Sequence, residues 1–193
     1  MAALMGLSRA IDALSEAVGR WTSWLVLLAV LICAGNALIR YSLHISSNAW
    51  LELQWYLFAA IFLLGAGYTL KRDEHVRIDV VTGRFPERVR VWIDIGGLCL
   101  FLLPISAVIL WFAAPYAWDA FVSGEKSGNA GGLVRWPAKF LIVAGFVLLI
   151  LQALSELIKR IAYLRGQLPA AMFGRAANGL ADDAPSPSND LQP

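Results

Sequence analysis

The stretch VWIDIGGLCLFLLPISAVILWFAA, residues 91–114, decides the fold class, because it holds a single charged residue, Asp94, in 24 positions. An α-helix rises about 1.5 Å per residue, so about 20 residues cross the ~30 Å hydrocarbon core of a bilayer. This stretch is therefore long enough and apolar enough to form a membrane-spanning helix.

Three further stretches have the same character, at residues 21–39, 50–70 and 137–157. Their only charged residues are Glu52, Lys139 and Glu156. The chain of 193 residues is 59% hydrophobic and 16% charged, whereas soluble domains carry about 25% charged residues. Backbone groups in hydrocarbon must be hydrogen-bonded internally, and none of the stretches shows the alternating polarity of barrel strands. We therefore predict an all-α integral membrane protein with four transmembrane helices.

The distribution of Lys and Arg predicts the orientation of these helices. Twelve of the sixteen lie in the N-terminal segment, the 71–90 connector and the C-terminal part, and four lie on the opposite side. Positively charged residues remain on the cytoplasmic side of membranes. We therefore expect both termini and the 71–90 connector to be cytoplasmic, and residues 40–49 and 115–136 to face the periplasm.

The two ends of the chain are predicted to differ from the membrane domain, residues 21–165. In residues 1–20, apolar side chains recur in steps of three and four from Leu4 to Val18, which predicts an amphipathic helix. We expect its apolar face to lie in the inner interface or against a partner helix. Residues 166–193 end in DDAPSPSNDLQP and are expected to form a disordered cytoplasmic tail.

The charged residues of the predicted spans lie close to span ends. Glu52 and Asp94 occupy first helical turns, where the helix dipole favours a carboxylate. Pairing with basic groups of a partner subunit is the alternative for both. Glu156 precedes Lys159 and Arg160 by three and four residues, which predicts a local ion pair. Lys139 is expected to snorkel outward to water.

Two features of the spans concern helix packing. Ala29, Cys33 and Ala37 form a stripe of small residues beside Asn36, which favours a close helix contact, expected within the subunit. Pro104 removes a backbone hydrogen bond in the middle of its span, so a kink is expected there.

Several function classes are excluded by residue placement. The chain has no basic cluster beyond membrane-flanking positions, so nucleic acid is not an expected partner. Cys33 and Cys99 lie inside spans without a CxxC spacing, and His44 and His75 lie on opposite sides of the membrane, so zinc and haem sites are not expected. A solvated segment of mixed charge explains the spacing of His75 and Asp79 without a metal. We expect no cofactor, no metal and no catalytic residue.

Three stretches carry a resemblance to a known family. Residues 48–81, NAWLELQWYLFAAIFLLGAGYTLKRDEHVRIDVV, resemble the second span and following connector of the small membrane subunit of tripartite ATP-independent periplasmic (TRAP) transporters, the DctQ-like family. Residues 123–140, SGEKSGNAGGLVRWPAKF, and residues 151–160, LQALSELIKR, are similar to later parts of the same family. The resemblance covers about residues 15–165.

The resemblance implies a transporter subunit that is not an enzyme. Such systems combine a periplasmic substrate-binding protein, a large membrane subunit that holds the substrate and sodium sites, and a small four-helix subunit. The small subunit is expected to brace the scaffold of the large one and to help dock the binding protein. The implied process is ion-gradient-driven uptake of small organic anions across the bacterial inner membrane.

Position and resemblance together suggest nine residues that contact partners. Residues 40–49 and 115–136 would face the binding protein, and Arg77 and Asp79 of the HVRID segment would clamp helix ends or the large subunit. The nine candidates are Glu52, Gln54, His75, Arg77, Asp79, Glu125, Lys126, Arg135 and Trp136.

Two functions of other classes remain as alternatives. A self-sufficient four-helix exporter needs a carboxylate deep in the bilayer, but helix rise places Glu52 near the surface. A membrane redox enzyme or cytochrome needs cysteine or histidine ligands near one another, and the placement of both residue types argues against it.

Overall fold

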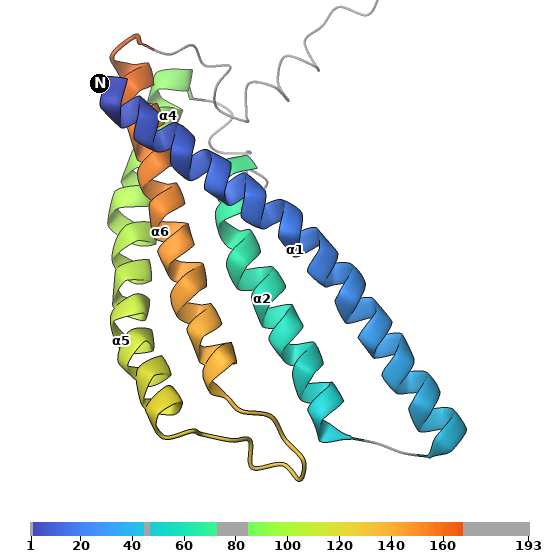
Figure 1. Cartoon of the computed structure of the whole chain (residues 1–193). Helices are drawn as coiled ribbons and strands as arrows, with labels where there is room; N and C mark the ends of the chain where they lie inside the picture. Colours follow the sequence, from blue (N-terminus) through green and yellow to red (C-terminus); the bar gives the residue numbers. More distant parts are fainter. Residues whose placement is uncertain (1, 45–46, 73–84, 168–193) are drawn as a thin grey trace, which may run out of the picture.

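The computed structural model describes residues 2–44, 47–72 and 85–167. These residues form long helices that run roughly side by side (Figure 1). The elements are α1 (Ala2–Leu43), α2 (Asn48–Arg72), α4 (Glu87–Gly97), the π-helix η1 (Leu98–Leu102), α5 (Leu103–Val122) and α6 (Trp136–Leu164). No strand occurs in the described ranges, where β-pairing is limited to a single bridge between Lys126 and Val134.

Four helical rods of the described chain are long and apolar enough to cross a membrane, as predicted. The third rod runs without a break through α4, η1 and α5. Each predicted span lies inside one of the rods, so the prediction of four helices able to span a membrane, with no strands, is confirmed for the described residues. The rods are Ala3–Leu43, Asn48–Arg72, Glu87–Val122 and Trp136–Leu164.

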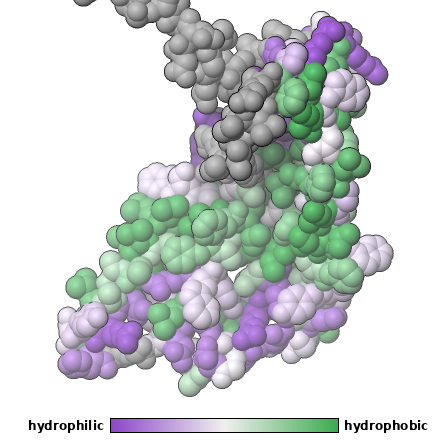
Figure 2. Space-filling model, turned by 180° about the vertical axis from the view of Figure 1, so that it is seen from behind, coloured by the Kyte–Doolittle hydropathy of each residue, from purple (hydrophilic) through white to green (hydrophobic). Residues whose placement is uncertain are grey.

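The rods are arranged with α2 and α6 at the centre, α5 beside α6, and α1 beside α2 (Figure 1). The N-terminal half of α1 crosses α6, and its C-terminal half diverges from α2. We call the end that carries residues 123–135 the outer end, following the predicted orientation. Figure 2 shows hydrophobic side chains across the middle of the molecule and hydrophilic ones gathered at this outer end.

Glycines allow α2 and α6 to approach each other closely. A Cβ atom at Gly145 would lie 2.7 Å from the Leu63 Cβ and 2.9 Å from the Leu63 carbonyl oxygen. A Cβ at Gly67 would lie 3.4 Å from the carbonyl oxygen of Leu148. Such contacts through small residues are the usual means by which membrane helices associate, because lipid leaves no hydrophobic driving force between them.

Gly145→Ala is therefore expected to push α6 away from α2 and to destabilise the bundle by about 1–3 kcal/mol, the usual cost of overpacking. The matched control is Gly96→Ala, because a Cβ there meets no atom of another described segment within 4 Å. Thermal unfolding of both variants in detergent micelles measures the difference. Equal Tm values would show that the α2–α6 contact is not tight at Gly145.

The N-terminal segment is helical, but it is not the separate helix that was predicted for residues 1–20. α1 continues from Ala2 to Leu43, so the segment and the first span form one rod. The apolar side chains of Leu4, Leu7 and Leu14 are 44–53% exposed, whereas Ser8 and Ser15 are buried together with Ile11. The polar face turns toward the bundle because it forms hydrogen bonds to α6, described below. The expected location in the inner interface stays a prediction.

Proline has different local effects at its two positions in the third rod. Before Pro104 the backbone widens into η1, where the Leu103 N–H bonds to the Leu98 carbonyl. The wider turn accommodates the proline ring and the absence of an N–H donor at Pro104. The backbone before Pro104 is therefore a π-bulge, and the kink expected there stays a prediction. Pro115 does not end the rod, which continues past the predicted boundary at Ala114 to Val122.

The predicted contact of small residues on α1 forms only in part. Ala29 is buried at 2% exposure, but Cys33 and Ala37 are exposed and Asn36 is half-buried. The expectation of an intrasubunit contact along the whole stripe was wrong. The reason is the divergence of α1 from α2 toward the outer end, which leaves this part of the stripe uncovered (Figure 1).

Candidate functional site

Glu52 at the start of α2 holds the outer loop, residues 123–135, against the bundle. Its Oε1 atom accepts hydrogen bonds from the Ser127 hydroxyl and, at 2.9 Å, from Nδ2 of Asn129. Its Oε2 atom accepts one at 2.7 Å from the backbone N–H of Leu133. The Glu52 residue is 4% exposed. We call these four residues the outer clasp.

The outer loop is also attached to α2 at two further points. The Tyr56 hydroxyl donates a hydrogen bond of 2.9 Å to the carbonyl of Val134, and Nδ2 of Asn48 donates one of 3.1 Å to the carbonyl of Ala130. The loop is thus connected to α2 at both ends and in its middle. Loops that carry function are commonly positioned by a rigid scaffold in this way.

Lys139, in the first turn of α6, does not snorkel to water as predicted. It is 8% exposed, and its ammonium lies 2.5 Å from the Glu125 carboxylate and 3.6 Å from the centre of the Tyr116 ring. A carboxylate and an aromatic face inside the chain replace the expected hydration. Arg135 lies 3.7 Å from the same Glu125 carboxylate.

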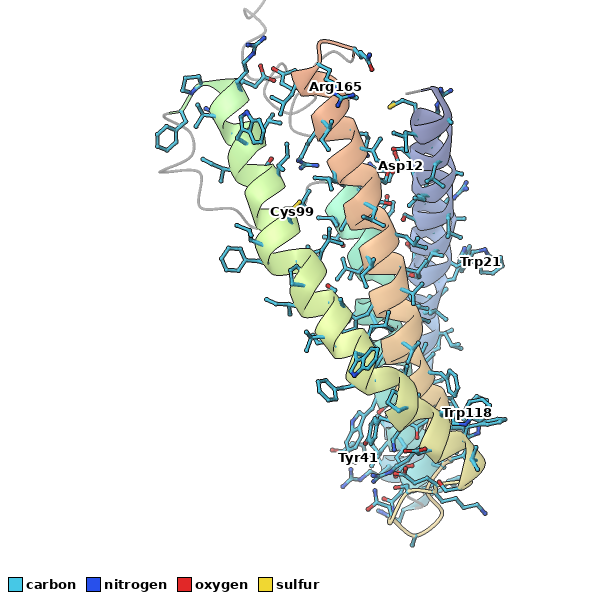
Figure 3. All side chains as sticks on the ribbon, turned by 90° about the vertical axis from the view of Figure 1, so that its left-hand side faces the viewer. Asp12, Trp21, Tyr41, Cys99, Trp118 and Arg165 are labelled. Atoms are coloured by element: carbon cyan, nitrogen blue, oxygen red, sulfur yellow. The ribbon has the colours of Figure 1, made fainter. Side chains whose placement is uncertain are left out.

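A second polar cluster joins α1 to α6 at the opposite, inner end of the bundle. Oδ1 of Asp12 accepts hydrogen bonds from Gln152 at 2.9 Å and from Ser155 at 2.8 Å (Figure 3). Oδ2 of Asp12 lies 3.1 Å from the Lys159 ammonium. Gln152 and Ser155 have no exposed surface. We call this cluster the inner network, made of Ser8, Asp12, Ser15, Gln152, Ser155, Glu156, Lys159 and Arg160.

The charged part of the inner network reaches across to α4. Glu156 contacts Lys159, and its Oε2 atom lies 2.5 Å from Nη1 of Arg160. Nε of Arg160 lies 3.5 Å from Asp94 on α4. The local ion pair predicted for Glu156 is confirmed. Asp94 finds a basic partner too, on α6 of its own chain.

Every charged residue of the predicted spans has a partner at one end of the bundle. Glu52 and Lys139 are bonded at the outer end, and Asp94 and Glu156 are paired at the inner end. In the described part of the chain, no group of three or more His, Cys, Asp or Glu side chains is placed to hold a metal ion. The arrangement fixes helices and a loop in place, and its carboxylates are already engaged by partners within the chain.

The structure describes six of the nine predicted interface residues. Glu52, Glu125 and Arg135 lie in or beside the outer loop contacts, and Lys126 is exposed. Trp136 packs edge-to-face on Phe121, with ring centres 5.4 Å apart. Gln54 is buried at 8% exposure and does not join the outer clasp. His75, Arg77 and Asp79 lie outside the described residues.

Sequence reasoning missed the inner network, although a signal was present. Ser8, Asp12 and Ser15 recur in steps of four and three on α1, and Gln152, Ser155 and Lys159 in steps of three and four on α6. Such spacing places polar groups on one face of each helix. Two polar faces of this kind in a membrane protein bury each other, because hydrocarbon solvates neither.

Comparison with known families gives one match. The model that describes the DctQ component of tripartite ATP-independent periplasmic transporters matches residues 29–162, most of the chain. The protein belongs to the DctQ family. A comparison with curated proteins and one with solved structures gave no match.

Membership in the DctQ family indicates the general role of this chain. DctQ components are parts of a TRAP transporter and not an enzyme family, and as a family they work with a large membrane subunit and a substrate-binding protein. The matched residues contain the whole outer clasp and the α6 side of the inner network. The polar face of the N-terminal half of α1, with Asp12, precedes the match.

Proposed function

We propose that this DctQ chain is the static small permease subunit of its transporter. In this role it braces the scaffold of the large membrane subunit and helps to dock the periplasmic substrate-binding protein. The transport that it serves is uptake of small organic anions across the bacterial inner membrane, driven by an ion gradient such as that of sodium.

The observation that carries this proposal is the pairing of the charged residues in the predicted spans. A chain that moves an ion by itself keeps an ionisable group facing a path through the membrane. Here the charges of the spans lie at the two ends, bonded to a loop or to neighbouring helices. The alternative of a self-sufficient exporter would require Glu52 to leave the outer clasp.

The exposed apolar surface supports the bracing role. α1 exposes Trp21, Trp24 and Leu31 by 60–75%, and α5 exposes Trp111 and Phe112 by 69–77%. Neither face is covered by another described helix. Exposed apolar surfaces of this composition fit either lipid or the helices of a larger membrane partner.

Reconstitution tests the proposed function. Purification of this chain with the large subunit, followed by uptake into liposomes, should require both proteins and the binding protein. An ion gradient should drive the uptake. Substrate-driven ion exchange by this chain alone, or full uptake without it, would show that the proposal is wrong.

Docking to the binding protein is expected to depend on Lys126, whose side chain points to solvent from the outer loop. Lys126→Glu reverses a charge on this surface and should raise the binding-protein concentration for half-maximal uptake about fivefold, with a smaller effect at high salt. The control is Arg165→Glu, an exposed residue at the inner end. Equal half-maximal concentrations for the two variants would remove Lys126 from the docking surface.

A further inference from the structure

A small cavity opens on the outward face of α1 near its inner end. It measures about 140 Å³ and is lined by Ala17, Arg20, Trp21 and Trp24. These residues share one face of the helix, because they are spaced by three and four positions. Trp21 and Trp24 are 75% and 67% exposed, and Figure 3 shows Trp21 pointing away from the other helices.

The polar groups of this cavity can only donate hydrogen bonds. The Arg20 guanidinium carries five N–H donors and each indole carries one, and none of them accepts. The remaining wall is the methyl group of Ala17 and the faces of the tryptophan rings. A ligand that satisfies such a wall must offer several acceptor oxygens and carry negative charge.

Among the described residues around the cavity, cations outnumber carboxylates. Three cations, Lys71, Arg72 and Arg20, act on the one carboxylate of Glu16. Lys71 forms the direct contact with it, at 2.5 Å, and the Arg72 guanidinium lies over the Tyr68 ring at 5.1 Å. Lys71 thus takes the direct contact with Glu16, and the exposed Arg20 guanidinium acts on Glu16 only through its charge.

We propose that this cavity binds the phosphate of an anionic phospholipid of the inner leaflet. Arg20 and the two indoles donate to the phosphate oxygens, at the depth where tryptophan residues meet headgroups. The acyl chains then run along Leu27, Leu28 and Leu31, which are 44–60% exposed on the same rod. The proposal rests on the proposed function and on the predicted cytoplasmic orientation of the inner end.

Lipid retention tests the proposal on the complex with the large subunit. The complex is reconstituted in nanodiscs that contain phosphatidylglycerol and phosphatidylcholine in equal amounts, and the lipids that stay bound are weighed by native mass spectrometry. We expect preferential retention of phosphatidylglycerol, and about tenfold less of it in Arg20→Gln, because a charge-assisted donor is lost. Arg9→Gln is the matched control, since Arg9 is exposed on α1 but outside the cavity.

Four results would overturn the proposal. They are equal retention in Arg20→Gln and Arg9→Gln, no preference for phosphatidylglycerol, displacement of the lipid by inorganic phosphate, and loss of the large subunit from Arg20→Gln with unchanged lipid. The last would assign Arg20 to an acidic group of that subunit.

A Trp21→Leu and Trp24→Leu double variant, which keeps the apolar surface, should also lose the preference for phosphatidylglycerol. Repeating the comparison on this chain alone separates the lipid site from the proposed function, because lipid retention does not require the partner.

Discussion

Glu52→Ala is expected to release the outer loop, so that protease cleavage within residues 123–135 becomes about tenfold faster while the four rods remain folded. The substitution removes both oxygens that accept from Ser127, Asn129 and the backbone of Leu133. These three donors lose their acceptor at once. As the loop loses its fixed conformation, uptake that depends on the binding protein should decrease. The large subunit should still co-purify with the variant.

The isosteric variant Glu52→Gln separates loss of the charge from loss of the hydrogen bonds. Its amide oxygen can still accept from the Leu133 N–H, and its NH₂ group can donate to the Ser127 hydroxyl or to a turned Asn129 amide, so the loop should be released less than in Glu52→Ala. Asp119→Ala is the control, since it removes an exposed carboxylate at the same end of the molecule. Limited proteolysis of the purified complex measures all three. Cleavage of Glu52→Ala at the rate of Asp119→Ala would contradict the outer clasp.

Arg160→Ala is expected to destabilise the bundle by about 3–5 kcal/mol, the usual cost of removing one partner from a buried ion pair. Arg160 is 5% exposed and is paired with Glu156 at 2.5 Å and with Asp94 at 3.5 Å. Without it, Asp94 loses this partner, and Glu156 is left with Lys159, which already pairs with Asp12. Equilibrium unfolding in mixed micelles measures the loss.

Two further variants separate a lost pair from a lost side chain. Arg165→Ala removes an exposed arginine just beyond the end of α6 and should change stability little. The double variant Glu156→Leu with Arg160→Leu should recover most of the stability, because apolar residues often replace a buried ion pair without loss. If the double variant is as unstable as Arg160→Ala, the pairing is not the source of the effect.

Long apolar stretches were sufficient to predict the number of spans and the helical class. A backbone in hydrocarbon has no other partner for its hydrogen bonds, so hydropathy and length decide the outcome together. The pair of Glu156 with Arg160 was predictable for a similar reason, since residues four apart on a helix are always neighbours. Both predictions depend on geometry within one helix.

The partners of the other charged residues were not predictable in this way. Glu52, Lys139 and Asp12 were each visible in the sequence, but each bonds to residues more than ten positions away. Which of those contacts form depends on how the rods cross and on where the outer loop folds back. Lys139 shows the consequence, because reasoning from its own helix placed it in water.

The sequence by itself determined that this DctQ protein has four helices long and apolar enough to cross a membrane, with the charged residues of the predicted spans close to span ends. Only the tertiary structure decided that α1 is one rod with its polar face turned inward, and that Glu52 holds the outer loop. The physical reason is that hydrophobicity acts on each segment separately, whereas a buried hydrogen bond requires two segments to meet in one geometry.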